Sequence, residues 1–476
     1  MIIQIAVALL ITALIGYATW RKVRSAHAAH DGSGKDVFLA GGGLTWLYVA
    51  GSITLTNLST EQLVGMNGNQ MFLLAWWELA GFVGLLILAG VFVPIYYRNQ
   101  CTTVTELLER RYSGSSVRTI VAGIFLVGSV LVYIPAALYS GSLFLKTMLG
   151  FQGSLLVFAL PMAAIAALYT ILGGLRAVAV MDTYSGIGVL AIALLVVVLA
   201  LNAIGWDFSG IPPERLSMIG ATDAPIPFHT LFTGMLFIQI FYWSTNQNIT
   251  QKAMTAPTVR EAQKGVLAAA AVRILIVPLI VVVPGVVAFK LFGPLGDASY
   301  GRIVAHVLPG WLSGAFAAMM AAAVIAHTAA ILNGAVALYS VDFHDRFIAK
   351  VSDHWRLAMK ATIVMAAAGV VLVPLFENAK SIINTLQQLN GLTSMPILSA
   401  FIVGLLFKGV RASAASAAIV FGVLFYGFLT YQPHAFLPGW FHYIDAMLVT
   451  LVACVVVALA VNKALGGETV RDSASL

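Results

Sequence analysis

The sequence predicts an all-α integral membrane protein of about thirteen transmembrane helices, and composition is the first reason. Of the 476 residues, 60% are hydrophobic and only 9% are charged, with a mean hydropathy of +0.94. Soluble proteins carry about 25% charged residues, so a chain with this much apolar surface is expected to lie in lipid. The net charge of +7 comes from short basic clusters between apolar stretches. Such scattered clusters do not form the basic face of a nucleic-acid-binding protein.

The second reason is the length of the apolar stretches, because a helix needs about 20 apolar residues to cross a bilayer. Such stretches occur at 2–20, 44–66, 71–97, 118–148, 153–173, 177–204, 228–250, 264–293, 310–340, 357–377, 381–407, 412–432 and 440–463. The first lacks a basic n-region and an A-x-A site, so we expect a retained helix and not a cleaved signal. We expect a single membrane domain over 1–476, with no soluble domain.

The third reason is that the loops alternate in charge. The loops after the first, third, fifth, seventh, ninth and eleventh stretches contain arginine, lysine or histidine, whereas the loop at 206–227 contains three acidic residues. Basic loops face the cytoplasm, so we expect an external N-terminus and a cytoplasmic C-terminus in the plasma (inner) membrane. The charged segment 102–111 is too short to span and is expected to form an interfacial helix on the cytoplasmic side.

A run of polar residues interrupts the second stretch between Thr54 and Gln62 (TLTNLSTEQ). Each unpaired polar group facing lipid costs several kcal/mol. A helix that is broken here would instead line a cavity near the middle of the bilayer, where secondary transporters hold a solute and an ion. The sequence contains no His/Cys cluster, nucleophile elbow or ATP-binding motif. We therefore expect a transporter that is not an enzyme and needs no cofactor.

Several motifs extend this interpretation along nearly the whole chain. They are DVFLAGG (36–42), SITLTNLSTEQLVGMNG (52–68), TVTELLERRY (103–112), YTILGGLRAVAVMD (169–182), FYWSTNQNITQKA (241–253), LNGAVALYSVDF (332–343) and LQQLNGLTS (386–394). In this order they resemble the sodium/solute symporter family, and its sugar-transporting branch in particular. The resemblance implies a LeuT-like core of two inverted five-helix repeats, 44–204 and 228–407, whose first helix is discontinuous. An extra helix (2–20) would precede this core, and two peripheral helices (412–463) would follow it.

The resemblance also implies which side chains bind the solute. They are Asn57, Gln62, Trp77, Glu78, Gln239, Tyr242, Trp243 and Gln387. This set suits a sugar or polyol, because amides and a carboxylate pair with hydroxyls and an aromatic ring covers the apolar face. The family's basic residue has no direct match: Arg273 lies one position away, which would rotate it by about 100° on a helix. Gly81 replaces a serine, so one hydroxyl contact is expected to be lost, and Glu61 is expected to cap or pair near the helix break.

The ion site departs from the family. The resemblance implies backbone oxygens at Leu55, Leu58 and Ala323, plus two side-chain hydroxyls that fall on Ala326 and His327. Neither a methyl group nor an imidazole suits sodium, so we expect the metal site to be degraded.

The imidazole of His327 could carry a proton in place of the ion, because its reference pKa is near 6.5. Asp182 is its expected partner. Proton-coupled import of a sugar or polyol is therefore favoured. A sodium-coupled symporter that uses Thr328 or backbone ligands remains an alternative, as does a sensor that binds solute without transporting it.

Overall fold

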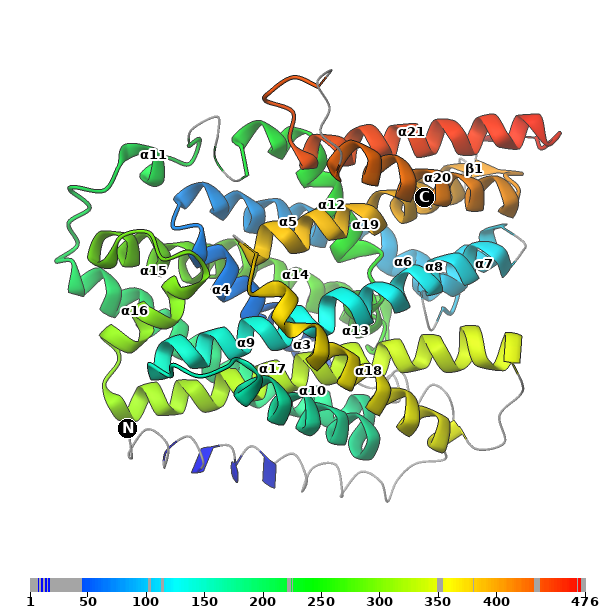
Figure 1. Cartoon of the computed structure of the whole chain (residues 1–476). Coiled ribbons are helices and arrows are strands. Elements are labelled where there is room, and N and C mark those ends of the chain that lie inside the picture. Colours follow the sequence, from blue (N-terminus) through cyan, green and yellow to red (C-terminus); the bar gives the residue numbers. More distant parts are fainter. Residues whose placement is uncertain are drawn as a thin grey trace.

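The computed structural model of the chain describes residues 45–101, 104–112, 115–220, 224, 226–348, 354–379, 381–431, 437–468 and 470–471, with scattered positions between 7 and 17. Within this part, nine helical segments are long and apolar enough to cross a membrane, and two shorter apolar segments are Leu156–Leu172, which belongs to α10, and Gly234–Ser244. Most helices run alongside one another in one bundle (Figure 1). The all-α membrane fold is confirmed, whereas the number thirteen stays a prediction.

The helices fall into three groups in chain order. The first group contains α3 (Trp46–Asn57), α4 (Thr60–Gly68), α5 (Ala75–Ile87), α6 (Val93–Arg98), α7 (Val104–Tyr112), α8 (Ser115–Gly128), α9 (Ile134–Leu149), α10 (Leu156–Ala203) and α11 (Pro213–Leu216). The second contains α12 (Gly234–Ser244), α13 (Gln247–Ala253), α14 (Val259–Leu275), α15 (Val277–Phe292), α16 (Ser299–Val307), α17 (Gly310–Ala337), α18 (His354–Phe376) and α19 (Ile382–Leu406). The last contains α20 (Ala412–Tyr431) and α21 (Tyr443–Ala464).

Short elements join or interrupt these helices. The 3₁₀ turns are η2 (Phe72–Leu74), η5 (Phe228–Phe232) and η6 (Gly296–Ala298), and the π-helical segments are η3 (Leu88–Phe92), η4 (Ser129–Tyr133) and η7 (Leu338–Ile348). Strands β1 (Phe407–Lys408) and β2 (Val470–Arg471) form a small antiparallel pair.

The predicted helix break is present between α3 and α4. Leu58 and Ser59 separate the two helices, and Ser59 is extended at φ −69° and ψ 159°. The break is shorter than the polar run, because Thr54 to Asn57 stay in α3 and Thr60 to Gln62 already belong to α4. A second break, at Thr245 and Asn246, separates α12 from α13. Both breaks free backbone groups that a regular helix would consume.

Two other expectations concern the segment 102–111 and the boundary between two predicted spans. The charged segment expected to be interfacial forms the amphipathic helix α7, with Val104, Leu107 and Leu108 buried. The stretches 153–173 and 177–204, expected as separate spans, are both parts of the continuous helix α10. Gly173 and Gly174 therefore do not end the helical backbone there.

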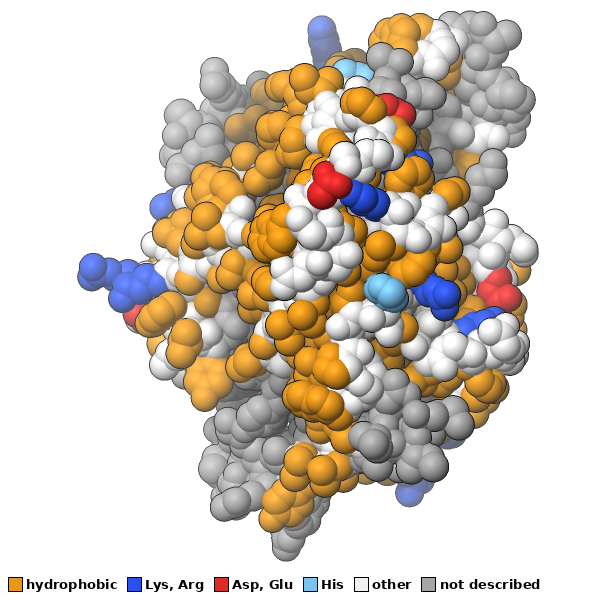
Figure 2. All heavy atoms as spheres, turned by 90° about the vertical axis from the view of Figure 1, so that its left-hand side faces the viewer, with side chains coloured by type: hydrophobic (Ala, Val, Ile, Leu, Met, Phe, Trp, Pro, Cys, Tyr) orange, Lys and Arg blue, Asp and Glu red, His pale blue; other side chains and the backbone are white. Residues whose placement is uncertain are grey.

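The connection that contains α11 and the basic helix α7 lie at opposite ends of the bundle (Figure 1). In Figure 1, α11 and α16 are at one end, and α7 and β1 are at the other. Figure 2 faces the end with α11 and α16, where charged side chains stand singly or in small groups among hydrophobic ones. This separation agrees with the alternation of the loops, whereas which end faces the cytoplasm stays a prediction.

We expect cysteines introduced near α11 to react with a membrane-impermeant maleimide added to intact cells. Cysteines introduced in α7 should react only after permeabilisation, because the basic end should face the cytoplasm. The native Cys101 and Cys454, both buried, would first be replaced. Labelling of α11 from the cytoplasmic side would reverse the orientation.

A buried carboxyl joins several elements at the α16 end. Asp297 in η6 is 8% exposed, and its Oδ2 accepts a hydrogen bond from the Ile382 backbone nitrogen at 2.8 Å. A methyl group added at Gly68 would lie 2.6 Å from Asp297 Oδ1, so only glycine lets α4 approach so closely. Burial raises the pKa of Asp297 from 3.8 to about 7. The carboxyl lies between membrane spans, and its protonation should therefore respond to the bulk pH.

This raised pKa predicts a pH-dependent stability with a defined sign. The folded state favours protonated Asp297. The stability that this group contributes is therefore fully present below pH 3.8 and is lost as the pH rises to about 7. Between pH 5 and 7 we expect the free energy of unfolding to fall by roughly 1 kcal/mol per pH unit from this group. Thermal unfolding in detergent would measure it. Asp297→Asn should flatten that slope, and an unchanged slope in this variant would assign it to other groups.

Candidate solute- and ion-binding site

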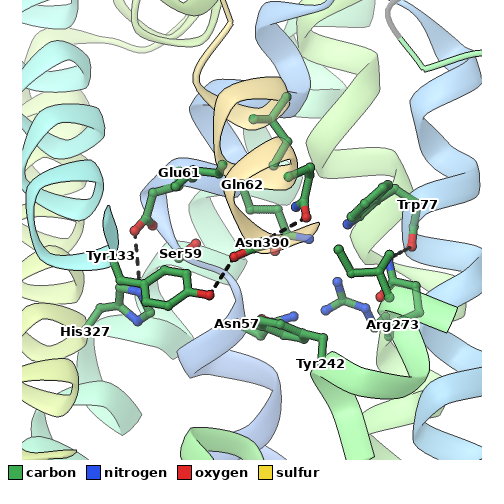
Figure 3. Close-up of a pocket in the computed structure, with 15 residues that line it drawn as sticks. Asn57, Ser59, Glu61, Gln62, Trp77, Tyr133, Tyr242, Arg273, His327 and Asn390 are labelled. Atoms are coloured by element: carbon green, nitrogen blue, oxygen red, sulfur yellow. Dashed lines mark hydrogen bonds and ion pairs between the residues drawn. The ribbon is translucent and has the colours of Figure 1, made fainter. Parts of the chain in front are cut away.

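One cavity lies beside the break between α3 and α4. It has a volume of about 100 Å³, enough for a small polar solute, since one water needs roughly 10–15 Å³. Figure 3 shows Glu61 and His327 on one side, Trp77 and Arg273 on the other, and Asn390 between them. The lining residues are Asn57, Ser59, Glu61, Gln62, Trp77, Tyr133, Ile238, Gln239, Tyr242, Arg273, His327, Ile383, Leu386, Gln387 and Asn390.

A buried ion pair stands at the Trp77 side of this cavity. The side chain of Glu78 is 0% exposed and forms an ion pair with Arg273, which is 5% exposed. The other carboxylate oxygen of Glu78 accepts a hydrogen bond from Gln62 Nε2. Glu78 itself does not line the cavity. It lies behind Gln62 and Arg273 and contacts both of them.

The position of Arg273 corrects an expectation drawn from its register. A shift of one position was expected to turn it elsewhere, yet it lines the cavity in the last turn of α14. Gly81 explains why the longer side chain fits: a methyl group there would lie 2.8 Å from Arg273 Nε. The site of the expected lost hydroxyl is thus the space that the guanidinium occupies. The guanidinium carbon of Arg273 also lies over the Trp243 ring, 4.3 Å from the ring centre, in a cation–π contact.

Asn57 connects this ion pair to Tyr242. Its side-chain amide lies 2.7 Å from the Tyr242 hydroxyl and also contacts the guanidinium. A guanidinium can only donate, so the amide oxygen faces Arg273 Nη2 at 3.1 Å and the amide nitrogen donates to the hydroxyl. The end of α3 is therefore tied to α12 and α14 across the cavity.

The two remaining predicted residues on α12 differ in their access to the cavity. Gln239 lines it, but Gln239 Nε2 donates to the Trp77 carbonyl at 2.9 Å and Gln239 Oε1 accepts from Trp243 Nε1 at 3.0 Å. Trp243 is buried and does not line the cavity. Six of the eight predicted solute-binding residues therefore reach the cavity, and Glu78 and Trp243 support them from behind.

Two neighbours of Gln387 were missed by sequence reasoning. Tyr133 donates to Asn390 Oδ1 at 2.6 Å, and Asn390 Nδ2 donates to Gln387 Oε1 at 3.1 Å. Asn390 could have been found, because residues three apart share a helix face. Tyr133 ends the π-helical segment η4, and no signal in the sequence places that irregular turn beside α19.

The opposite side of the cavity holds an acid–histidine pair. His327 Nε2 on α17 lies 3.5 Å from Glu61 Oε1, in the first turn of α4. The negative side chain is also favourable at the start of a helix. Glu61, expected to cap or pair near the break, therefore pairs with His327 on α17, the residue expected to stand in place of a sodium-binding hydroxyl. Ala326 beside it is buried and has no side-chain oxygen.

The other residues expected at the ion site are placed less fully. Leu55 lies in α3, Leu58 in the break and Ala323 in α17. Asp182 lies in α10, but its side chain is outside the described part of the structure. Thr328 is buried, and its hydroxyl has no hydrogen-bond partner among the described residues. Groups of three or more His, Cys, Asp or Glu residues that could hold a metal do not occur among those residues.

Comparison with known proteins identifies this arrangement of helices and cavity. A family model described as the sodium:solute symporter family matches residues 37–422. The chain belongs to the sodium:solute symporter family. This symporter is 34% identical to the uncharacterized symporter YidK of Escherichia coli, over 95% of this chain and 82% of that protein. It is 29% identical to the sodium/glucose cotransporter of Vibrio parahaemolyticus, over 94% and 88%.

Solved structures agree with this assignment at the level of the fold. A Na⁺-coupled sialic acid symporter matches with a TM-score of 0.80 at 15% identity, over 99% of both chains. The transporter Mhp1 matches with a TM-score of 0.58 at 16% identity, over 90% of this symporter and 94% of Mhp1. Their shared LeuT fold confirms the predicted LeuT-like core. The symporter is thus an ion-coupled solute transporter and not an enzyme.

Proposed function

We propose that this symporter imports a sugar or a sugar-like polyol by alternating access, in the plasma (inner) membrane. The observation that carries the proposal is a cavity walled by amides and aromatic rings beside a broken helix. Amides can donate to and accept from hydroxyls, and Trp77 or Tyr242 can cover the apolar face of a ring. The names of two relatives, sodium/glucose cotransporter and mouse sodium/myo-inositol cotransporter 2, support this solute class.

We further propose that protons drive the import through His327. The resemblance places a sodium-binding hydroxyl of the family at the position of this imidazole, and Glu61 lies 3.5 Å away as a counter-charge. A protonated imidazole would hold α4 and α17 together, as a bound cation would. Loss of the proton would weaken that contact, because a ligand shifts an equilibrium by its differential affinity for two states. Asp182 stays a candidate second partner.

Sodium coupling is the second candidate, and a specific observation favours it. The Thr328 hydroxyl is buried and has no partner among the described groups. Together with backbone oxygens of Leu55, Leu58 or Ala323 it would offer the oxygen ligands that sodium prefers. A sensor that binds the solute without moving it is the third candidate.

Uptake into proteoliposomes tests these candidates together. Labelled D-glucose, D-galactose and myo-inositol would be offered under an inward proton gradient or an inward sodium gradient, each imposed alone. Accumulation with the proton gradient alone would support the proposal, whereas accumulation with sodium alone would favour the Thr328 alternative. Binding without uptake would indicate a sensor. If none of the three solutes binds, the assignment to sugars and polyols is wrong.

A further inference from the structure

Two of the glutamines that line the cavity, Gln62 and Gln387, are held by opposite ends of their amides. Gln62 Nε2 donates to Glu78, which leaves Gln62 Oε1 without a hydrogen-bond partner among the described residues. Gln387 Oε1 accepts from Asn390, so its nitrogen is the end that stays available. Both side chains are only 8% exposed, and a buried amide has few other partners to choose from.

The orientation of Gln387 depends on a chain of donors that begins at Tyr133. The Tyr133 hydroxyl has one proton and gives it to Asn390 Oδ1 at 2.6 Å. An amide that accepts at its oxygen can donate only through its nitrogen, and Asn390 Nδ2 does so to Gln387 Oε1 at 3.1 Å. Figure 3 shows the Tyr133 hydroxyl pointing toward Asn390, between the side with Glu61 and the side with Trp77. Each bond in this chain fixes the direction of the next.

We propose that Tyr133 and Asn390 are positioning residues that turn the Gln387 amide nitrogen toward the solute. The α19 wall of the cavity then donates hydrogen bonds, and Gln62 on the α4 wall accepts them. A solute hydroxyl at Gln387 is therefore recognised through its oxygen, and one at Gln62 through its proton. The inference rests on the proposed function for its effect on transport, but not for the orientation of the amide itself.

Two variants separate this role from simple loss of packing. Tyr133→Phe keeps the ring and removes the first donor, so the Asn390 amide is no longer fixed. Asn390→Asp has no N–H to offer, so Gln387 must turn its nitrogen to the new carboxylate and present its oxygen to the solute. Tyr300→Phe is the matched control, because this buried hydroxyl on α16 has no partner among the described residues. Gln387→Glu presents an oxygen to the solute directly.

Uptake would be measured with whichever of D-glucose, D-galactose and myo-inositol the wild type takes up fastest. Tyr133→Phe should raise KM about five- to tenfold with Vmax within twofold of the wild type, the effect of weakening one hydrogen bond. Asn390→Asp should raise KM further, to the level of Gln387→Glu, and Tyr300→Phe should leave it unchanged. An unchanged KM in Tyr133→Phe and Asn390→Asp would overturn the inference.

A second measurement needs no solute. In protein labelled with ¹⁵N at glutamine side chains, the Gln387 signal is the one absent from Gln387→Glu. It should shift in Tyr133→Phe and Asn390→Asp and stay in place in Tyr300→Phe. A signal that does not move in either test variant overturns the positioning role even if transport is lost. If the wild type takes up none of the three solutes, the proposed function fails while this measurement still decides the orientation.

Discussion

Arg273→Met is expected to abolish solute binding and to lower the free energy of unfolding by about 3–5 kcal/mol. The reason is that Glu78, 0% exposed, would lose the charge that compensates it, and breaking one side of a buried ion pair costs about that much. Gln62 and Asn57 would lose their fixed orientations at the same time, because both contact this pair. Thermal unfolding and equilibrium binding of labelled solute would measure the two effects.

The double variant Glu78→Gln with Arg273→Met provides the internal comparison. It removes both charges, so much of the stability should return while binding stays lost. Lys290→Met is the surface control, because the Asp207 side chain that it pairs with at 3.0 Å is 59% exposed and solvent screens such a pair. If Arg273→Met and Lys290→Met destabilise the protein equally, the charge of Arg273 does not stabilise buried Glu78 as described.

His327→Ala is expected to abolish solute accumulation driven by a proton gradient while sparing passive exchange. The side chain supplies the only proposed proton carrier, and its loss would leave Glu61 facing α17 without the imidazole 3.5 Å away. Accumulation and exchange would be measured separately in the same proteoliposomes, with labelled solute inside or outside. The expected accumulation ratio is close to one, whereas the exchange rate should stay within a few-fold of the wild type.

A control and a restoration sharpen this test. His306→Ala removes an exposed histidine outside the cavity and should change neither the accumulation ratio nor the exchange rate. Ala326→Ser with His327→Ser returns two hydroxyls to α17 and should introduce dependence on sodium. If wild-type accumulation requires sodium and ignores an imposed pH gradient, proton coupling is wrong and Thr328→Ala becomes the decisive variant.

The broken first core helix could be predicted because seven of the nine residues from Thr54 to Gln62 are polar, and such a run is incompatible with lipid wherever the exact break lies. Composition alone cannot say that only Leu58 and Ser59 leave the helix, since that depends on how Ser59 and the start of α4 pack. The continuous α10 could not be predicted for a similar reason. Arg176, between the apolar stretches 153–173 and 177–204, indicates a loop, but the backbone there is helical.

At the site, the residue types were predictable and their contacts were not. The position of Arg273 could not be read from helix register, because the space that receives it comes from Gly81 on another helix. Tyr133 was missed because a π-helical turn changes which side chain faces the cavity. The Glu61–His327 contact was missed because it joins residues 266 positions apart, and pairing of that kind depends on how two helices pack.

The charges around the cavity also have an electrical consequence. With both carboxylates ionised, Glu78 is balanced by Arg273, whereas Glu61 is balanced only when His327 carries a proton. If protons drive the import as proposed, the loaded cavity is neutral in these groups and the empty one carries one negative charge. A membrane potential acts at about 2.3 kcal/mol per charge per 100 mV. Under the proposed proton coupling, the voltage should act on the return of the empty carrier and not on the inward step with solute. Hyperpolarisation should then speed net uptake but leave exchange of solute for solute unchanged.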